Sequence, residues 1–139
     1  MSNDLFALEQ ETVRCRVDKK GIAWVTMSRP KEMNALSAQS FEEMLPLLER
    51  LGQDDAVRVV VLTGEGRAFC AGGDLQEMQE GFDGNHGFYK HMELANRFTV
   101  ALAELPKPVI SPPNILNLQP ASISTMQAPL GSAVSLQVI

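Results

Sequence analysis

A glycine-rich loop in the middle of the sequence contains the residue types best suited to chemistry. Residues 63–73 read TGEGRAFCAGG, with four glycines, and Asp74 follows directly. Glycines let the backbone turn its N–H groups outward and let a ligand approach closely. A short helix expected over Leu75–Gln79 would add the positive potential of its N-terminus. The loop is therefore suited to stabilising an oxygen that carries negative charge. The alternative is a tight turn that needs glycine only for its shape.

The other reactive side chains near this loop favour structural roles. Asp74 is expected to cap the following helix, because Asp is common at the N-cap. Cys70 has no evident partner base, so nucleophilic catalysis by Cys70 with His86 or His91 is disfavoured. We expect both histidines at the surface, one in a loop and one on a helix. Three carboxylates are expected to face solvent rather than take part in catalysis: Glu65, Glu77 and Glu80.

Apolar runs predict the strands that position this loop. Residues Thr12–Asp18 alternate between apolar and polar side chains, and residues Ile22–Met27 are rich in β-formers. The turn signal Lys19-Lys20-Gly21 joins the two into a hairpin. Residues Val57–Leu62 form a continuous apolar run with one arginine, which indicates a strand buried on both faces. A further strand is expected to begin at Val109–Ile110.

Two longer helices are predicted, one on each side of the glycine-rich loop. Ser37 or Ser40 is expected to cap the first helix, and Ser40 has capping-box spacing to Glu43. Pro46 lies within this helix and should kink it or cost about 3 kcal/mol. The second helix is expected over Phe88–Glu104. Its predicted apolar stripe consists of Met92, Ala95, Phe98, Thr99 and Leu102.

Charge is distributed unevenly along the 139 residues. All 12 Lys and Arg and all 17 Asp and Glu lie within residues 1–107, and none lies in residues 108–139. The net charge of −5, with no basic cluster longer than Lys19-Lys20, argues against a nucleic acid or an anionic membrane as partner. No apolar run predicts a transmembrane helix, and the acidic N-terminus argues against a secretory signal. We expect a cytoplasmic protein in which Cys15 and Cys70 are reduced thiols.

Three sequence blocks, in order, resemble the enoyl-CoA hydratase/isomerase (crotonase) family. They are residues 28–36 (SRPKEMNAL), 66–75 (GRAFCAGGDL) and 105–110 (LPKPVI). The combination is specific, whereas any one block alone would be weak. The resemblance covers about residues 10–111 and corresponds to the N-terminal half of a crotonase-fold chain. It implies an α/β protein with a partial crotonase-like (ClpP/crotonase) ββα spiral fold.

The same resemblance divides the chain into two parts. Residues 1–110 are expected to form the N-terminal part of a crotonase-like domain. Residues 111–139 form an uncharged tail rich in Pro, Ser and Gln that does not match the family. Within this tail, a strand over Ala133–Ile139 is the most that the pattern supports.

The resemblance also implies which residues bind substrate. Family enzymes convert an acyl-CoA thioester to an enolate-like state, and two backbone N–H groups stabilise its oxygen. The first of these donors corresponds to Gly73, and such a donor is worth about 2.7–4 kcal/mol. Ala71 and Leu75 are expected to line the acyl or pantetheine channel. No metal is expected, and coenzyme A enters only as part of the substrate.

The segment Lys31–Leu36 resembles the one that wraps the adenine and phosphates of coenzyme A. The backbone at Asn34, Ala35 and Leu36 would contact adenine, and Arg29 or Lys31 would meet phosphate. The alternative is a solvated turn after a strand. The full set of expected contacts is Arg29, Lys31, Asn34, Ala35, Leu36, Ala71, Gly72, Gly73, Asp74 and Leu75.

The likeness stops soon after Val109–Ile110. Family members continue into Asn-Gly and a glycine-rich turn, which supplies the second N–H donor, and then into acidic residues that move protons. Here Asn114 can hold the place of the family Asn, but Ile115 stands where Gly is expected, and no Asp or Glu follows Glu104. Two origins fit: a truncated or frame-shifted crotonase, which we favour, or a genuine variant with a replaced C-terminus.

The sequence therefore predicts an acyl-CoA hydratase or double-bond isomerase lineage, linked to fatty acid metabolism and impaired in catalysis. The expected partner is an acyl-CoA thioester. Family members are usually homotrimers or hexamers, an assembly that depends on the half with no counterpart here. The rival prediction is a non-catalytic protein that binds CoA thioesters or associates with full-length crotonase subunits.

Overall fold

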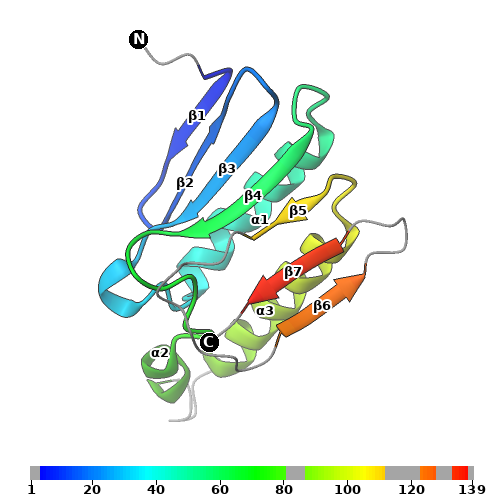
Figure 1. The fold of residues 1–139 in the computed structure, drawn as a ribbon. Coiled ribbons are helices and arrows are strands. Elements are labelled where there is room, and N and C mark those ends of the chain that lie inside the picture. The colour runs from blue at the N-terminus through cyan, green and yellow to red at the C-terminus, as the bar shows by residue number, and fades with distance from the viewer. Residues whose placement is uncertain (1–3, 81–86, 112–122, 128–132, 138–139) are drawn as a thin grey trace.

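The centre of the molecule is a five-stranded sheet in the order β1-β2-β3-β4-β5 (Figure 1). The computed structural model describes residues 4–80, 87–111, 123–127 and 133–137. Neighbouring strands run antiparallel from β1 to β3 and parallel from β3 to β5. The strands are β1 (Phe6–Glu9), β2 (Val13–Val17), β3 (Ile22–Met27), β4 (Val59–Gly64) and β5 (Val109–Ile110).

The predicted hairpin is confirmed by β2 and β3, whose register pairs Val13 with Met27 and Val17 with Ala23. Every second residue of each strand is buried, as alternation requires. At the turn, the Asp18 carboxylate accepts hydrogen bonds from the Lys20 and Ile22 backbone N–H groups. Strand β1 was not anticipated, because its four residues alternate only weakly between half-buried and exposed.

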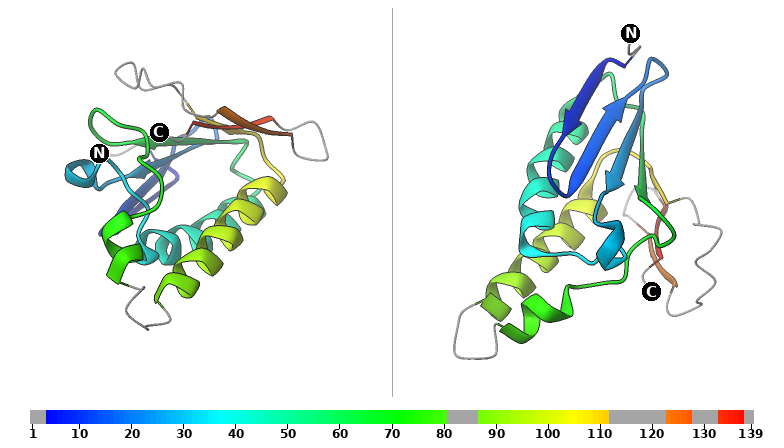
Figure 2. Two further views of the ribbon diagram at one scale, coloured as in Figure 1. Left: turned by 90° about the horizontal axis from the view of Figure 1, so that it is seen from below. Right: turned by 90° about the vertical axis from the view of Figure 1, so that its left-hand side faces the viewer.

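Two helices cover one face of the sheet: α1 (Ala38–Gln53), which connects β3 to β4, and α3 (Gly87–Glu104), which leads to β5 (Figure 2). A 3₁₀ turn, η1 (Pro30–Glu32), follows β3, and a short helix, α2 (Leu75–Glu80), precedes α3. The architecture is therefore mixed α/β, as predicted. The core between sheet and helices includes Val13, Val25, Val60, Phe41, Met44, Leu48, Phe98 and Leu102.

The N-terminus of α1 is capped by Ser37, whose side chain accepts a hydrogen bond from the Ser40 N–H at 3.1 Å. The capping box predicted from Ser40 and Glu43 is wrong, because Ser40 lies inside the helix and is buried. The helix runs without a break through Pro46. That proline is exposed, and so is Glu42, whose carbonyl is the one that loses its helical N–H donor.

The buried face of α3 differs from the predicted stripe. Phe98 and Leu102 are buried as expected, but Met92 is 47% exposed, and the other buried positions are His91 and Leu94. Thr99, also predicted on the stripe, is exposed, and the prediction passed over His91. The expected surface position of His91 is wrong: the residue is 2% exposed. His86 lies outside the described residues.

Strand β4 is buried over three consecutive residues, Val60, Val61 and Leu62, so both faces of its centre are covered as predicted. Its start is held by the Lys107 ammonium, which donates to the carbonyls of Asp54 and Val57, each at 2.6 Å. The last charged residue of the sequence thus ties the end of α3 to the strand next to it.

A second, two-stranded antiparallel sheet consists of β6 (Ile123–Gln127) and β7 (Ala133–Gln137). Strand β7 lies next to β5, at the edge of the main sheet (Figure 1). The strand expected over Ala133–Ile139 is present as β7, whereas β6 was not anticipated. No helix among the described residues is both long enough and apolar enough to span a bilayer.

Candidate functional site

The first two sequence blocks lie side by side, although about thirty residues separate them. The Leu36 N–H donates to the Gly72 carbonyl at 2.8 Å, and the Asp74 N–H donates to the Leu36 carbonyl at 3.0 Å. Leu36 and Gly73 thus form a parallel β-bridge. The glycine-rich loop is held in an extended conformation against the segment that follows β3.

Asn34 fixes the turn that makes this contact possible. Its backbone is left-handed, with a φ of 57°, and its side chain is buried. The side-chain oxygen accepts from the Arg29 N–H at 2.9 Å. The side-chain nitrogen donates to the carbonyls of Glu65 and Ala68 at 2.9 and 2.8 Å. Asparagine tolerates a left-handed backbone better than most residues, and here its amide also joins both loops.

Gly64 is required where the glycine-rich loop leaves β4. A Cβ atom at this position would lie 2.3 Å from the Phe69 carbonyl oxygen and 2.6 Å from that of Ala68. Both obstacles are backbone atoms, so no side-chain movement could relieve the clash. The glycine lets the loop fold back onto the end of its own strand.

Arg29 and Asp74 form a largely buried ion pair, with 3.0 Å between the guanidinium Nη2 and the carboxylate Oδ2. The same guanidinium donates to the Ala35 carbonyl at 2.6 Å, and the other Asp74 oxygen accepts from the Glu77 N–H at 3.1 Å. Partial burial acts to raise the pKa of Asp74. The hydrogen bond from Glu77 and the Arg29 charge outweigh it, so the pKa lies below its usual value. The prediction that Asp74 caps the next helix is confirmed.

The N–H of Gly73 has no hydrogen-bond partner among the described residues. In a parallel bridge, the residue opposite Leu36 directs its own N–H away from Leu36, since bonding groups alternate along an extended chain. Gly73 is also exposed, next to the start of α2. A polarised carbonyl oxygen could therefore accept a hydrogen bond here from a donor that is already rigidly placed.

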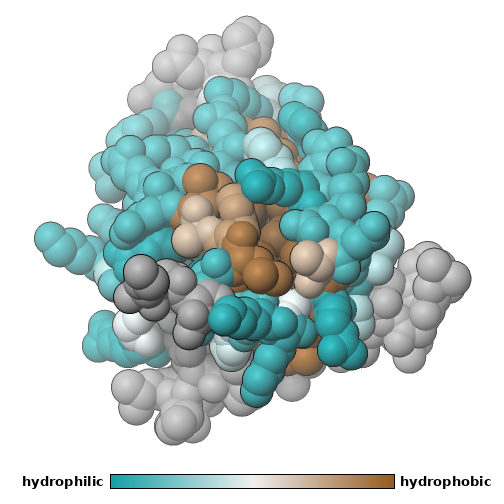
Figure 3. All heavy atoms as spheres, turned by 90° about the horizontal axis from the view of Figure 1, so that it is seen from above, coloured by the Kyte–Doolittle hydropathy of each residue, from teal (hydrophilic) through white to brown (hydrophobic). Residues whose placement is uncertain are grey.

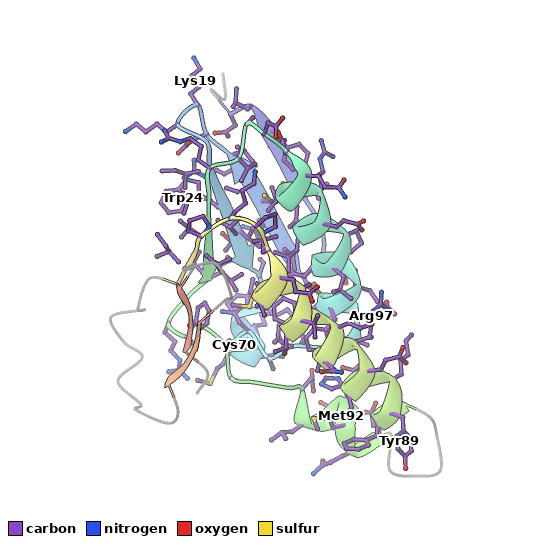
Figure 4. The ribbon with its side chains drawn as sticks, turned by 90° about the vertical axis from the view of Figure 1, so that its right-hand side faces the viewer. Lys19, Trp24, Cys70, Tyr89, Met92 and Arg97 are labelled. Carbon is purple, nitrogen blue, oxygen red and sulfur yellow. The ribbon has the colours of Figure 1, made fainter. Side chains whose placement is uncertain are left out.

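Both cysteines of the chain are buried free thiols. Burial raises the pKa of Cys15 to about 11 and also raises that of Cys70. The Cys70 sulfur accepts a hydrogen bond from the Gly72 N–H at 3.4 Å. Figure 4 shows Cys70 in the loop below the sheet. With its thiol protonated and enclosed, Cys70 shapes the loop and is a poor nucleophile.

Glu77 and His91 are the site residues that the sequence reasoning missed. The Glu77 carboxylate accepts from the Ala38 N–H at 2.9 and 3.1 Å, so it binds the first turn of α1 instead of facing solvent as predicted. The buried His91 ring has its Nδ1 at 3.5 Å from the Glu77 Oε2. Nothing in the sequence pairs these two residues, because they meet only through the packing of α2 against α3.

The remaining predicted residues lie around this centre. Lys31 is exposed on η1, Ala71 is half-buried, and Leu75 is 73% exposed beside Gly73. Glu65 accepts a hydrogen bond from the Ser28 hydroxyl and lies 3.5 Å from Arg14, while Glu80 is exposed as predicted. The described residues contain no cluster of three or more potential metal ligands.

Comparison with known proteins places this arrangement in context. A family model described as enoyl-CoA hydratase/isomerase matches residues 18–114. The chain is 35% identical over 92 residues to trans-2-decenoyl-(acyl-carrier-protein) isomerase of Streptococcus mutans. It is 33% identical over 100 residues to 1,2-epoxyphenylacetyl-CoA isomerase of Escherichia coli. These alignments cover 65% and 66% of this chain.

Solved structures show the same likeness. A crystal structure described as a putative enoyl-CoA hydratase/isomerase from Mycobacterium abscessus superposes with a TM-score of 0.67 at 35% identity, over 73% of this chain. A protein of Pseudomonas aeruginosa superposes equally well at 38% identity, over 72% of this chain. The alignments cover 40% and 43% of those chains, and 35% and 36% of the two curated relatives. The chain therefore spans about a third to two fifths of the length of these proteins.

Proposed function

This chain belongs to the enoyl-CoA hydratase/isomerase family, and from that premise we propose that it binds acyl-CoA thioesters with the thioester carbonyl at Gly73. The observation that carries the proposal is the Gly73 N–H, which has no hydrogen-bond partner in the described part of the chain and which the bridge to Leu36 directs outward. A donor fixed before the ligand arrives costs little reorganisation, which is why such sites stabilise developing charge well.

The side chains behind Gly73 support a binding role for its backbone. Arg29 joins the Asp74 carboxylate to the Ala35 carbonyl, so both segments of the bridge are tied by one guanidinium. Those contacts occupy the Arg29 side chain. Of the two cations considered for the CoA phosphates, Lys31 is therefore the better candidate, since it is exposed and forms no ion pair with a described residue.

The reaction class follows from the lineage. We propose hydratase or double-bond isomerase chemistry through an enolate-like state whose oxygen faces Gly73. A second N–H donor and the family's acids have no counterpart among the recognisable residues of this sequence. For the 139 residues as given, we therefore propose thioester binding with little or no hydration of crotonyl-CoA.

Calorimetric titration with butyryl-CoA tests the binding proposal. The key variants are Gly73→Pro, which removes the N–H, and Gly73→Ala, which keeps it. Both add a Cβ atom that would lie 3.1 Å from the His91 Nε2 and the Met78 sulfur, so the alanine variant controls for crowding. Loss of one hydrogen bond worth about 1.4 kcal/mol predicts roughly tenfold weaker binding for Gly73→Pro than for Gly73→Ala.

Two outcomes would count against the proposal. Equal affinities of Gly73→Pro and Gly73→Ala would show that the N–H does not bind the ligand. Hydration of crotonyl-CoA well above a protein-free control would contradict the expected lack of turnover. In that case the 139 residues would contain proton-transfer groups beyond those of the family pattern.

A further inference from the structure

A buried histidine lies directly beside the proposed thioester site. The His91 Nε2 is 3.1 Å from the point where a Cβ of Gly73 would be, so the imidazole, together with the Met78 sulfur, packs against that side of the glycine. The bridge to Leu36 places the Gly73 N–H along the edge of the extended segment, whereas Cβ positions stand above and below it. The ring therefore flanks the N–H and leaves it open.

The surroundings of His91 fix the orientation of its ring. The Phe41 ring packs edge to face against it, with 5.4 Å between centroids and an interplanar angle of 76°. The Nδ1 atom is fully enclosed and has no hydrogen-bond partner among the described residues. The nearest polar atom on that side is the Glu77 Oε2, at 3.5 Å. A buried imidazole with one nitrogen facing a carboxylate is the arrangement that orients a general base.

The Glu77 carboxylate lies on the Nδ1 side of the ring. An ionised carboxylate only accepts hydrogen bonds, so it favours the tautomer with the proton on Nδ1. Nε2 then presents its lone pair on the side of Gly73. Glu77 is itself held by the Ala38 N–H at the start of α1, so its carboxylate stays beside the His91 ring.

We propose that His91, oriented by Glu77, takes the α-proton of the thioester bound at Gly73. This inference rests on the proposed function and adds to it a base supplied by α3. The carbonyl oxygen lies about 2.9 Å from its donor nitrogen, and the α-carbon is two bonds from that oxygen. A group packed against Gly73 therefore lies beside the acidic C–H.

The step balances without any further reagent. The α-C–H bond breaks, its proton moves to Nε2, and its electron pair forms the enolate, whose oxygen accepts from the Gly73 N–H. The resulting imidazolium is stabilised by Glu77. Return of the proton regenerates the thioester, so in D₂O the cycle replaces α-hydrogen by deuterium. This half-reaction needs neither a second N–H donor nor another acid.

The charged groups near His91 lie on α1, on α2 and in the loop before α2. Glu77 on α2 is the one carboxylate within 4 Å of the ring nitrogens among the described residues. From α1, Glu42 is paired with Lys90 at 2.9 Å, and Asp74 is paired with Arg29. Glu77 is therefore the acidic group placed to orient the imidazole.

The test measures deuterium incorporation into butyryl-CoA by mass spectrometry, with calorimetric binding of the same thioester measured in parallel. His91→Gln should bind butyryl-CoA within about twofold of the unchanged chain and lose at least tenfold in exchange rate. Glu77→Gln should show a smaller loss. Met92→Gln, one residue along α3 with its side chain at the surface, is the matched control and should exchange at the full rate.

Each outcome distinguishes the two proposals. Absence of butyryl-CoA binding to the unchanged chain would overturn the proposed function and this inference with it. Binding without exchange, or full exchange by His91→Gln, would overturn only the role of His91. If His91→Gln does not fold, ¹⁵N NMR of the unchanged chain decides. A proton on Nδ1 and a shift of the Nε2 resonance on adding butyryl-CoA are expected, whereas an unshifted Nε2 would exclude the contact.

Discussion

Two sets of groups meet at the bridge between Leu36 and Gly73, and they differ in how their hydrogen-bonding capacity is used. The first set, which we call the brace, is the side chains of Arg29, Asn34 and Asp74, and each binds backbone or another member. The second, which we call the open site, is the Gly73 N–H and the His91 imidazole, which hold polar atoms without a hydrogen-bond partner among the residues that the structure describes.

This difference shows how a short loop can offer reactive groups without losing its shape. Unpaired polar atoms are costly when they are buried, so a structure retains them only where other contacts determine the conformation. Here the brace determines it. Changes in the brace should therefore cost stability, and changes in the open site should cost binding or exchange with little effect on stability.

The largest loss of stability is expected from Asn34→Ala. The substitution leaves the Arg29 N–H and the Glu65 and Ala68 carbonyls without their partner. At about 1–3 kcal/mol for each buried group left unpaired, the free energy of unfolding should fall by about 3 kcal/mol or more. Urea titration measures it.

Asn96→Ala is the matched control for this change, because Asn96 is exposed on α3. It should be neutral or slightly stabilising, since alanine is the better helix former. If Asn34→Ala costs no more than Asn96→Ala, the brace does not hold the loop.

A smaller loss is expected from Arg29→Met, which keeps the aliphatic stem and removes the guanidinium. Asp74 and the Ala35 carbonyl would lose their partner, at a cost of about 1–2 kcal/mol. Arg14→Met is the comparison, because Arg14 is half exposed and its ion pairs lie at the surface, where they contribute about 0–1 kcal/mol. Similar losses from the two substitutions would place Arg29 outside the brace.

The contribution of Asp74 to the stability of the fold depends on pH. Because the folded state lowers the pKa of Asp74, the carboxylate stabilises the fold fully above its unfolded pKa. That contribution is lost as the pH falls below the unfolded value and through the lowered folded one. As the pH falls from 6 into the acid range, the free energy of unfolding should therefore decrease less for Asp74→Asn than for the unchanged chain.

The exposed Asp55 provides the control for the pH experiment. Urea titrations at a series of pH values should show Asp55→Asn following the unchanged chain. A stability curve for Asp74→Asn parallel to that of the unchanged chain would contradict the assigned ion pair.

The smallest effect on stability is expected from Gly73→Ala. The added Cβ would meet the ends of two side chains, His91 and Met78, and the sulfur of Met78 can move aside. The free energy of unfolding should change by less than about 1 kcal/mol, while butyryl-CoA exchange should fall because the imidazole is displaced. A thermal scan with an exchange assay on the same sample checks both, and a large loss of stability would assign Gly73 to the brace.

Local pattern predicted much of the fold. The alternation in β2, the β-forming residues of β3, the apolar run of β4 and the cap at Asp74 are local features of the sequence, and all are confirmed. The shift of the stripe on α3 has a different origin. His91 occupies a core position because Glu77 and the Phe41 ring, from two other helices, surround it. Such a position cannot be recognised from helical periodicity alone.

The sequence predicted which residues form the candidate site better than it predicted which groups those residues contact. The resemblance pointed to Gly73 and to the segment around Asn34, and the structure brings them together. The resemblance could not show that the Asn34 side chain donates to backbone carbonyls, or that Glu77 binds the start of α1. These contacts join residues more than thirty positions apart, so they depend on how the helices cover the sheet.

Part of the surface is apolar. Figure 3 shows one face of the molecule, where apolar residues form a patch within a hydrophilic surround. The groove between α1 and α3 is lined in part by Leu45, Pro46 and Val100, and Val100 is 44% exposed. Polar residues such as Glu49 and Arg97 also line this groove.

The most direct test of the central claim is the amide resonance of Gly73 in a ¹⁵N-labelled sample. Butyryl-CoA should move its proton signal downfield, because the N–H gains an acceptor. S-butyl-CoA, a thioether with no carbonyl oxygen, should leave it almost unchanged while binding through the same nucleotide. Equal shifts with both ligands, or no shift with butyryl-CoA at saturating concentration, would contradict the assignment of Gly73 as the thioester donor.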